Sequence, residues 1–455
     1  MSTTPRYCAK GEVGVSKPIR VETDLVPSGL YGASDDWTGL TITRQLVRPL
    51  FVEGPDRTLR PGLLDRARRL DEKCWSLALR PDARWSDGRP IHARDIARHI
   101  ATVAQQAGPF AWLVSLIEQI RPVEADRLLL TTRRPVGNLP ALLANPVFGP
   151  RNADPAVSSG AYTMAEGPAG EIRLRATGPW PDITYVLSSG AEHGQRLFDQ
   201  QAVDVTCPTT FPVSRWAHRA DYPELRVDDL DIAVALLPPN GMAARRKHAV
   251  AAAIDRRELS QRLHGALGPL DSFTGLWEPG RATAPARVAR ELFPAAGRSP
   301  ARLVFPDFSP NRETARILAE QIGDHTGLVL RPEAIDYRAY LTELHTTHRE
   351  DFRLVLLASP WPDPAALLVP FARRPADQLP GGPASGFTEL VHRALAADDL
   401  QDRLAYCAQA EQLLLATGEV CLFGRLRSAA RLRVKNYVSP PSGWADLSVC
   451  ELPRD

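Results

Sequence analysis

Residues 84–106 constrain the fold more than any other stretch of this chain. They read RWSDGRPIHARDIARHIATVAQQ. The Ser-Asp-Gly turn at 86–88 is expected to follow a short strand that ends at Trp85. His92 stands where a helix N-cap belongs, and Asp95 follows three residues later, as in a capping box. Apolar side chains then recur at helical spacing: Ile96, Ile100 and Val103. The segment therefore predicts a strand, a tight turn and a capped helix in direct succession.

Length and composition limit the possible function classes. A chain of 455 residues is too long for one ordinary core, so two or more domains are expected. Its 55 basic and 53 acidic residues give a formal net charge of +2, which provides no overall attraction for nucleic acid or anionic membrane. No run of about 18 apolar residues occurs, so no membrane span is predicted.

The cysteines and the start of the chain bear on location. The six cysteines lie far apart without a C-x-x-C pair, which is typical of reduced, mostly buried thiols. Residues 1–16 contain no apolar stretch of signal-peptide length, and Cys8 follows Pro-Arg-Tyr rather than small residues. These features predict a cytoplasmic protein, without a signal peptide or lipid-anchor motif. The alternative is an extracytoplasmic protein whose signal has been removed.

The segment 84–106 resembles a signature of the peptide and nickel class of ABC-transporter solute-binding proteins. That signature reads close to a-K-W-S-D-G-x-P-v-T-A-x-D-v. Further similarities follow in the family's order. Residues 158–162 (SSGAY) stand where relatives have G-T-G-P-Y, and residues 249–256 are similar to R-x-A-i-x-y-A-I-D-R. Residues 354–364 resemble the strand that ends in W-x-a-D-Y-P-D-P, and 403–422 resemble the last helix and its strand.

The resemblance implies a two-lobed, periplasmic-binding-protein-like α/β fold of the large three-subdomain type, with the ligand enclosed between the lobes. Lobe one would be discontinuous, and residues 45–150 would form a subdomain inserted into it. Lobe two would be residues 238–422, reached through two crossing segments at 236–240 and 422–426. The three parts of lobe one would be 1–44, 151–237 and 423–455.

One position departs from the family pattern. The resemblance implies that an aspartate in the a-D-Y-P-D-P stretch pairs with the free α-amino group of a peptide ligand. Aligned on Pro362-Asp363-Pro364, that position is Pro360, which offers neither charge nor donor. We therefore expect the usual amine anchor to be absent. Asp363 is the nearest carboxylate and is either a ligand contact or part of a rigid turn.

Other candidate ligand contacts surround the expected cleft. Trp361, at the end of a strand, would supply a flat apolar wall or else pack in the core. Residues 19–23 (IRVET) are predicted to form a first strand. The acids and aromatics that follow it suit a cationic or amide-rich ligand, or form a solvated loop. Arg373 suits bidentate carboxylate recognition, unless it is simply exposed. The remaining candidates are Tyr31, Asp35, Asp36, Trp37, Ser158, Ser159, Asn240 and Trp277.

Catalytic and metal motifs are not found in the sequence. It contains no G-x-S-x-G, Walker, G-x-G-x-x-G or H-E-x-x-H pattern. His345 and His348 have helical spacing but no evident third ligand, so neither a metal nor a cofactor is predicted.

Two function classes stay open. The first is a monomeric solute-binding protein for a small-molecule or peptide-like, amide-bearing ligand. It would act as an intracellular carrier or sensor, or with an ABC permease if exported. The second is an enzyme of specialised metabolism that reuses the enclosing fold. Its acid–base chemistry on a bound intermediate would come from the residues that gather at the cleft, Tyr31, Asp35, Asp36 and Trp361.

Overall fold

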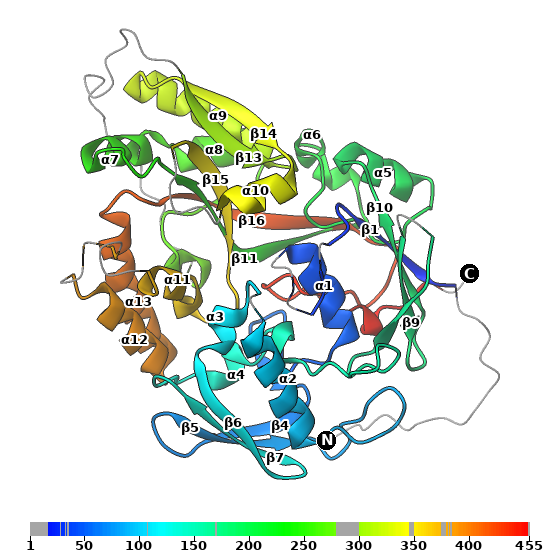
Figure 1. Ribbon diagram of the computed structural model, residues 1–455. Helices are drawn as coiled ribbons and strands as arrows, with labels where there is room; N and C mark the ends of the chain where they lie inside the picture. The colour runs from blue at the N-terminus through cyan, green and yellow to red at the C-terminus, as the bar shows by residue number, and fades with distance from the viewer. Residues whose placement is uncertain are drawn as a thin grey trace.

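The computed structural model describes most of the chain and shows a mixed α/β protein with three main sheets (Figure 1). The described residues are 17–27, 29–31, 33, 36–106, 108–168, 171–278, 300–344, 350–374, 379–380, 382 and 385–453. The candidate contact Asp35 and the histidine pair His345 and His348, for which no metal is predicted, lie outside these residues.

The first sheet belongs to lobe one and has the strand order β1-β10-β9-β8. Its strands are β1 (Ile19–Thr23), β8 (Tyr162–Ala165), β9 (Glu171–Ala176) and β10 (Ile183–Leu187). The sequence predicted β1 with these bounds. β1 runs parallel to β10, with Thr23 paired to Leu187, so both strands end at the same edge of the sheet. Two helices lie beside it, α1 (Trp37–Leu46) and α5 (Ala191–Asp199).

The inserted subdomain is built on an antiparallel sheet with the order β4-β5-β7-β6. Its strands are β4 (Leu64–Arg69), β5 (Cys74–Leu79), β6 (Ile117–Glu124) and β7 (Arg127–Thr132). A two-stranded hairpin precedes it, made by β2 (Phe51–Glu53) and β3 (Leu59–Pro61). The short helices of the inserted subdomain are α3 (Ala111–Val114), α4 (Leu139–Leu142) and the 3₁₀ turn η1 (Pro146–Phe148).

The capped helix predicted in this subdomain is α2 (Ala93–Gln105). The Asp95 carboxylate accepts a hydrogen bond from the backbone N–H of His92 at 2.9 Å, as the predicted capping box requires. The apolar side chains at helical spacing, Ile96, Ile100 and Val103, are buried. The predicted strand ending at Trp85 is wrong. Only an isolated bridge joins Arg84 to Pro90, because the turn at Gly88 folds the chain straight back.

The largest sheet has six strands in the order β12-β16-β11-β15-β13-β14. Its bounds are β11 (Leu225–Leu237), β12 (Leu267–Pro269), β13 (Ala301–Pro306), β14 (Leu330–Ile335), β15 (Phe352–Ala358) and β16 (Cys421–Arg431). The long antiparallel pair β11–β16 is interrupted by a register shift between Asp229 and Ala233. The predicted crossings at 236–240 and 422–426 fall at one end of this pair, and the lobe boundaries stay a prediction.

Helices surround this sheet and extend the second lobe (Figure 1). They are α7 (Ala244–Ala253), α8 (Arg256–Arg262), α9 (Asn311–Thr326), α10 (Tyr337–Leu344), α11 (Val369–Ala372), α12 (Phe387–Ala396) and α13 (Leu400–Leu415). The short helix α6 (Val213–Trp216) lies within the residue range of lobe one. The remaining 3₁₀ turns are η2 (Arg219–Asp221), η3 (Thr274–Leu276), η5 (Pro364–Leu367) and η7 (Leu447–Val449).

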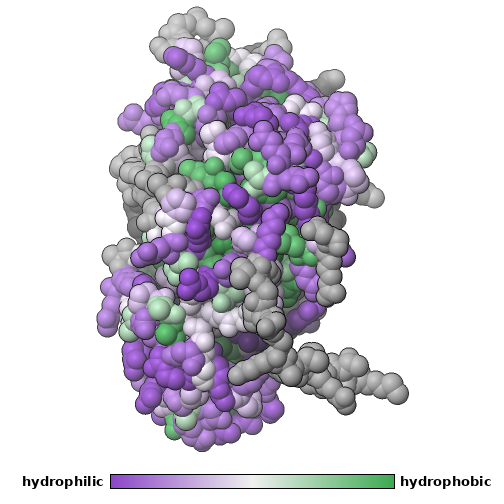
Figure 2. Space-filling view, turned by 90° about the vertical axis from the view of Figure 1, so that its right-hand side faces the viewer, coloured by the Kyte–Doolittle hydropathy of each residue, from purple (hydrophilic) through white to green (hydrophobic). Residues whose placement is uncertain are grey.

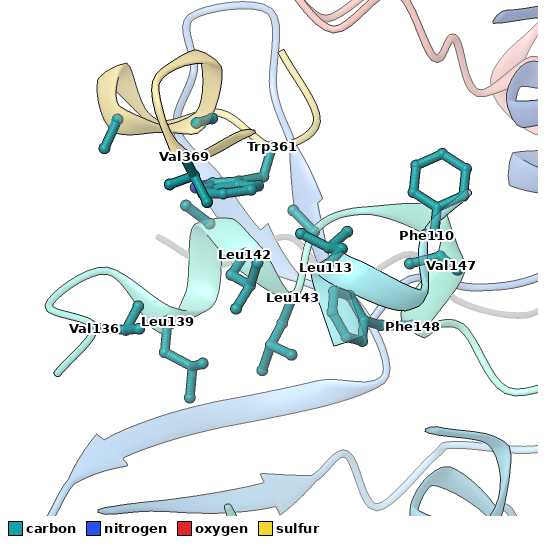
Figure 3. Close-up of a cluster of buried hydrophobic side chains, with 14 of the residues drawn as sticks. Phe110, Leu113, Val136, Leu139, Leu142, Leu143, Val147, Phe148, Trp361 and Val369 are labelled. Carbon is teal, nitrogen blue, oxygen red and sulfur yellow. The ribbon is translucent and has the colours of Figure 1, made fainter. Parts of the chain in front are cut away.

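One apolar core joins the inserted subdomain to the second lobe. Leu113, Leu142 and Phe148 of the subdomain belong to the same buried cluster as Trp361 and Val369 (Figure 3). Two further clusters fill the largest sheet with α7–α9 and the first sheet with the C-terminal segment. The two parts are therefore held together by continuous apolar packing, which stabilises their contact by removing side chains from water.

The remaining fold-level predictions concern thiols and membranes. The cysteines at 74, 207, 407, 421 and 450 are free, and all except Cys74 are buried. Within the part of the chain that the structure describes, no helix combines the length and apolarity needed to span a bilayer.

Candidate functional site

A cavity of about 750 Å³ separates the first sheet from the second lobe, and we call it the interlobe cavity. Its volume lies within the range of small-molecule sites, roughly 300–1,000 Å³. Lobe one contributes Asp24, Leu25, Trp37, Thr38, Ser188, Ser189, Gly190, Ala191, Glu192, Thr209, Thr210, Pro212, Val213 and Ser214. The six-stranded sheet and its helices contribute Ile232, Pro306, Asp307, Phe308, Ser309, Arg312, Glu313, Tyr337, Tyr340, Leu341, Leu356, Ala358 and Leu426.

A side view of the molecule shows where apolar surface gathers. Figure 2 looks at the side that carries α5 and β9 in Figure 1, and hydrophobic residues form a band at mid-height. Hydrophilic residues predominate above and below this band, where hydrophobic residues form only small spots. Contiguous exposed apolar surface is common at binding sites, whereas scattered apolar residues are ordinary.

Strand pairing explains the wall from lobe one. β1 and β10 are parallel and end together, so Asp24 and Ser188, each the next residue after its strand, reach the same edge. The edge where parallel strands end is a common place for ligand sites in α/β folds. Asp36 fixes the start of α1 behind this wall, because its carboxylate accepts the Gly39 N–H at 2.5 Å.

Aromatic side chains stiffen the opposite wall. Phe308, just after β13, packs edge-on against Tyr337 of α10, with ring centroids 6.0 Å apart and planes at 71°. The Tyr340 hydroxyl donates to the Leu354 carbonyl oxygen at 2.7 Å. α10 is thereby tied to β15, which fixes the position of this aromatic wall.

Two carboxyl groups lie at the end of β1. The Thr38 hydroxyl donates to Asp24 Oδ1 at 2.9 Å, and burial raises the pKa of Asp24. Burial also raises the pKa of Glu22 to about 7, although three hydrogen bonds oppose that shift. Glu22 accepts them from Ser188 Oγ at 2.8 Å, Cys207 N at 3.0 Å and Thr210 Oγ1 at 3.2 Å. Glu22 thus holds two hydroxyl groups that line the cavity.

The charges on the lining are mostly negative. Arg312 is paired with Asp307 at 2.6 Å, and Glu192 is paired at 2.9 Å with Arg215, which is not part of the lining. Asp24 and Glu313 then remain without a basic partner among the lining residues. The described lining therefore favours a neutral or cationic occupant over an anion.

Among the predicted contacts, Trp37 lines the interlobe cavity. Its neighbour Asp36 is buried, 2 % exposed, and acts as the cap of α1. Tyr31 lies elsewhere, in a second cavity of about 680 Å³ beside α2, where the Arg151 guanidinium stacks 4.5 Å from its ring centre.

Four other predicted contacts do not line the interlobe cavity. Ser158 and Ser159 are buried, and their hydroxyls donate to the carbonyl oxygens of Gly160 and Pro150. Asn240 is exposed in the turn after β11. Trp277 is half-buried beneath the Arg57 guanidinium, 4.6 Å from its ring centre.

Trp361 occupies the shared apolar core. It is 2 % exposed, and its ring lies 6.0 Å from that of Trp112 (Figure 3 shows it above Leu142). The structure thus shows the core-packing alternative, and a ligand contact by Trp361 stays a prediction. Trp112 of the inserted subdomain packs against the Trp361 ring, a long-range contact that the sequence alone did not reveal.

Asp363 and Arg373 also have structural partners. Asp363 is buried, caps η5 through the Ala365 N–H at 3.0 Å and lies 3.2 Å from Arg403 Nε. Burial raises its pKa to about 6 while Arg403 opposes the shift. Arg373 is exposed at a smaller cavity of about 310 Å³ and donates to Ser115 Oγ at 3.2 Å.

Sequence reasoning missed most of the cavity lining, including Asp24, Ser188, Thr210, Phe308 and Tyr340. A signal was present in the Ser-Ser-Gly run that follows β10 and precedes α5. Within the described ranges, no group of three or more His, Cys, Asp or Glu residues is placed to share a metal ion.

Comparisons with known proteins agree with this geometry. Residues 58–377 match the model of the bacterial extracellular solute-binding proteins, family 5 Middle. No curated protein matches the sequence significantly. Haemophilus influenzae OppA in complex with the peptide RPPGFSPFR superposes with a TM-score of 0.81 at 16% identity, covering 96% of this chain and 99% of that one.

Two further solved structures share the fold. The Escherichia coli murein tripeptide-binding protein MppA gives a TM-score of 0.80 at 15% identity over 97% of this chain and 100% of its own. NikA from Staphylococcus aureus, in complex with Ni(L-His)2, gives 0.77 at 15% identity over 94% and 97%. Because the family model covers most of the sequence, this chain belongs to the family 5 bacterial extracellular solute-binding proteins.

Proposed function

We propose that this protein encloses a small peptide-like or amide-bearing solute in the interlobe cavity, and that the lobes close around it. The observation that carries the proposal is that residues of both lobes form the cavity walls. Hydroxyl groups from Ser188, Ser189, Thr209 and Thr210 and the aromatic rings opposite them match the mixed polar and apolar surface of a short peptide.

The neighbouring structures support the same chemistry. OppA holds a peptide, and MppA is a murein tripeptide-binding protein. A volume of about 750 Å³ suits a ligand of a few residues rather than a long peptide. Closure shifts an open–closed equilibrium only if the solute binds the closed form more tightly, and a cavity lined from both lobes provides that difference.

Native mass spectrometry of the purified protein tests the proposal. We expect a stoichiometric adduct with the mass of a small peptide-like molecule, released on denaturation and identified by fragmentation. If no adduct is present, the same protein is titrated with a tripeptide pool while its radius of gyration is measured by small-angle scattering. Binding without compaction would contradict closure, and no binding to any tripeptide would contradict the peptide-like class.

One observation favours a second candidate, an enzyme that uses the same cavity. Glu22, with its pKa raised to about 7, accepts a hydrogen bond from the Ser188 hydroxyl at the cavity wall. A hydroxyl paired with a carboxylate that titrates near neutral pH has the form of a nucleophile and a general base. Recovery of tripeptides with changed masses after incubation, lost in Glu22→Gln, would support the enzyme. Recovery of unchanged peptides contradicts it.

The role and location of the protein belong to the proposal as well. We propose a carrier or sensor of the bound solute. The cytoplasmic location and the monomeric state stay predictions, tested by cell fractionation and by analytical ultracentrifugation. Coupling to an ABC permease is the corresponding expectation if the protein is found outside the cytoplasm.

A further inference from the structure

Asp24 is the acidic side chain nearest to the strand end that opens into the interlobe cavity. It follows β1 directly and belongs to the cavity lining. Its Oδ1 accepts the Thr38 hydroxyl at 2.9 Å, and no basic side chain of the described residues forms an ion pair with it. Asp24 is half-buried, and a carboxylate partly withdrawn from water without a counterion is energetically unfavourable until a cation reaches it.

The other acidic side chains of the lining either form ion pairs with arginines or lie at the start of a helix. Arg312 neutralises Asp307, and Arg215 neutralises Glu192. Glu313 lies in the first turn of α9, where the partial positive charge of the helix end stabilises it. Asp24 is therefore the acid of the described lining that has the most to gain from a positively charged ligand group.

The walls on both sides suit a cation. Trp37 lines the cavity beside Thr38 on lobe one, and Phe308, Tyr337 and Tyr340 line it from the second lobe. Aromatic rings attract cations through their electron-rich faces, and the attraction grows when water is excluded. At the end of β15, in the opposite wall, residues 358–361 read Ala-Ser-Pro-Trp and offer no acidic side chain. The end of β15 thus supplies no counter-charge, whereas the end of β1 supplies Asp24.

We propose that Asp24 anchors a positively charged group of the ligand, an ammonium or a guanidinium, so that lobe one carries the specificity for cationic solutes. This inference rests on the proposed function, since it assigns a charge to the solute held in the interlobe cavity. Thr38 acts as a positioning residue, because its hydroxyl holds one oxygen of the Asp24 carboxylate.

The test compares Asp24→Asn with a matched control, Asp36→Asn. Asp36 is also buried, lies close enough to raise the pKa of Asp24, and is absent from the cavity lining. Asparagine caps helices about as well as aspartate, so the control keeps α1 while it removes a nearby negative charge. Thermal unfolding followed by circular dichroism establishes that each variant is folded.

The probes are two pools of tripeptides with identical sequences and uncharged side chains. One pool has free amino termini and the other is N-acetylated. Affinities are measured by native mass spectrometry and by calorimetry. We expect wild-type protein and Asp36→Asn to bind the free pool roughly 30-fold or more tightly than the acetylated pool, the effect typical of a buried charge pair. Asp24→Asn is expected to lose this preference and to keep the affinity for acetylated peptides.

The outcomes separate this inference from the proposed function. Equal affinity of the wild-type protein for both pools, or a preference that survives in Asp24→Asn, overturns the anchor and leaves solute binding in place. If no tripeptide binds, the peptide-like class fails, and agmatine and tyramine then serve as simple organic cations. Binding of these amines that Asp24→Asn abolishes supports the anchor, and no binding to wild-type protein overturns it.

A second variant covers the case in which Asp24→Asn does not fold. Thr38→Val keeps the charge of Asp24 but removes the hydrogen bond that the Thr38 hydroxyl donates to it. We expect the preference for free amino termini to fall severalfold in this variant. An unchanged preference in folded Thr38→Val would contradict the role of this carboxylate.

Discussion

Arg57 holds the carboxylate of Asp231 through two hydrogen bonds, from Nη2 to Oδ1 at 2.7 Å and from Nε to Oδ2 at 3.1 Å. Arg57 comes from the turn between β2 and β3, and Asp231 lies in the irregular stretch of β11. The same guanidinium donates to the Leu276 carbonyl oxygen at 2.8 Å and stacks on Trp277. One side chain therefore joins the inserted subdomain, the long crossing strand and the second lobe.

Replacement of Arg57 by alanine is expected to destabilise this junction. Asp231 has a side chain only 1% exposed and would keep Arg425, at 3.1 Å, as its remaining partner. Because one of two cations is lost, we expect a fall in the free energy of unfolding of roughly 2 kcal/mol, below the full cost of an isolated buried charge. Urea denaturation measures it. Arg60→Ala, at an exposed position of the same hairpin, is the control, and an equal effect of both variants would contradict the junction.

Trp361→Ala is expected to cost more stability than a change at a ligand-lining residue. The indole is buried against Trp112, so its removal leaves a cavity in the shared core, with an expected loss of about 3 to 5 kcal/mol. Chemical denaturation of Trp361→Ala and Trp361→Phe gives the comparison, since phenylalanine retains part of the packing. A loss below about 1 kcal/mol in the alanine variant would show that the ring does not stabilise the core.

The protein is expected to become less stable as the pH rises towards neutrality, partly because of Glu53. Burial raises the pKa of this carboxyl from 4.5 to about 7, and Ser442 opposes that shift only in part. The folded state therefore keeps a proton that the unfolded state releases. The stability due to this proton is fully present below pH 4.5 and is lost as the pH rises to about 7.

The variant Glu53→Gln tests that pH dependence. We expect its unfolding temperature to fall less than that of the wild-type protein between pH 5 and pH 8. At pH 8 the free energy of unfolding of Glu53→Gln is expected to exceed that of the wild-type protein by on the order of 3 kcal/mol. Glu118→Gln, an exposed substitution on β6, should follow the wild-type curve. Parallel curves for Glu53→Gln and wild-type protein would show that Glu53 is ionised in the folded state.

Two glycine-to-alanine substitutions should have opposite effects on stability. A Cβ at Gly194 of α5 would lie 1.8 Å from Glu22 Oε1, so Gly194→Ala must displace the carboxyl that holds Ser188 and Thr210. At Gly323 of α9 a Cβ would lie 3.6 Å from the Leu328 carbonyl oxygen, an ordinary contact, so alanine there adds helix propensity worth about 1 kcal/mol at most. Thermal unfolding of both variants checks the difference, and stabilisation by Gly194→Ala would contradict the packing described for Glu22.

Local patterns in the sequence were sufficient for β1 and for the capped helix α2, because spacing and capping act over a few residues. The family resemblance, carried by several short motifs in order, led to the two-lobed fold. The site was harder to predict because its walls depend on long-range pairing. Only the parallel register of β1 and β10 brings Ser188 beside Asp24. Similarly, an aromatic residue at a strand end does not reveal that Trp112 will cover it.

The apolar core shared by the inserted subdomain and the second lobe also bears on how fast a solute enters and leaves. An opening motion that parts the two would bring Trp112 and Trp361 into water, and this exposure raises the activation barrier. We therefore expect slow association and a long residence time, with both rates set by the motion of the protein rather than by diffusion of the solute.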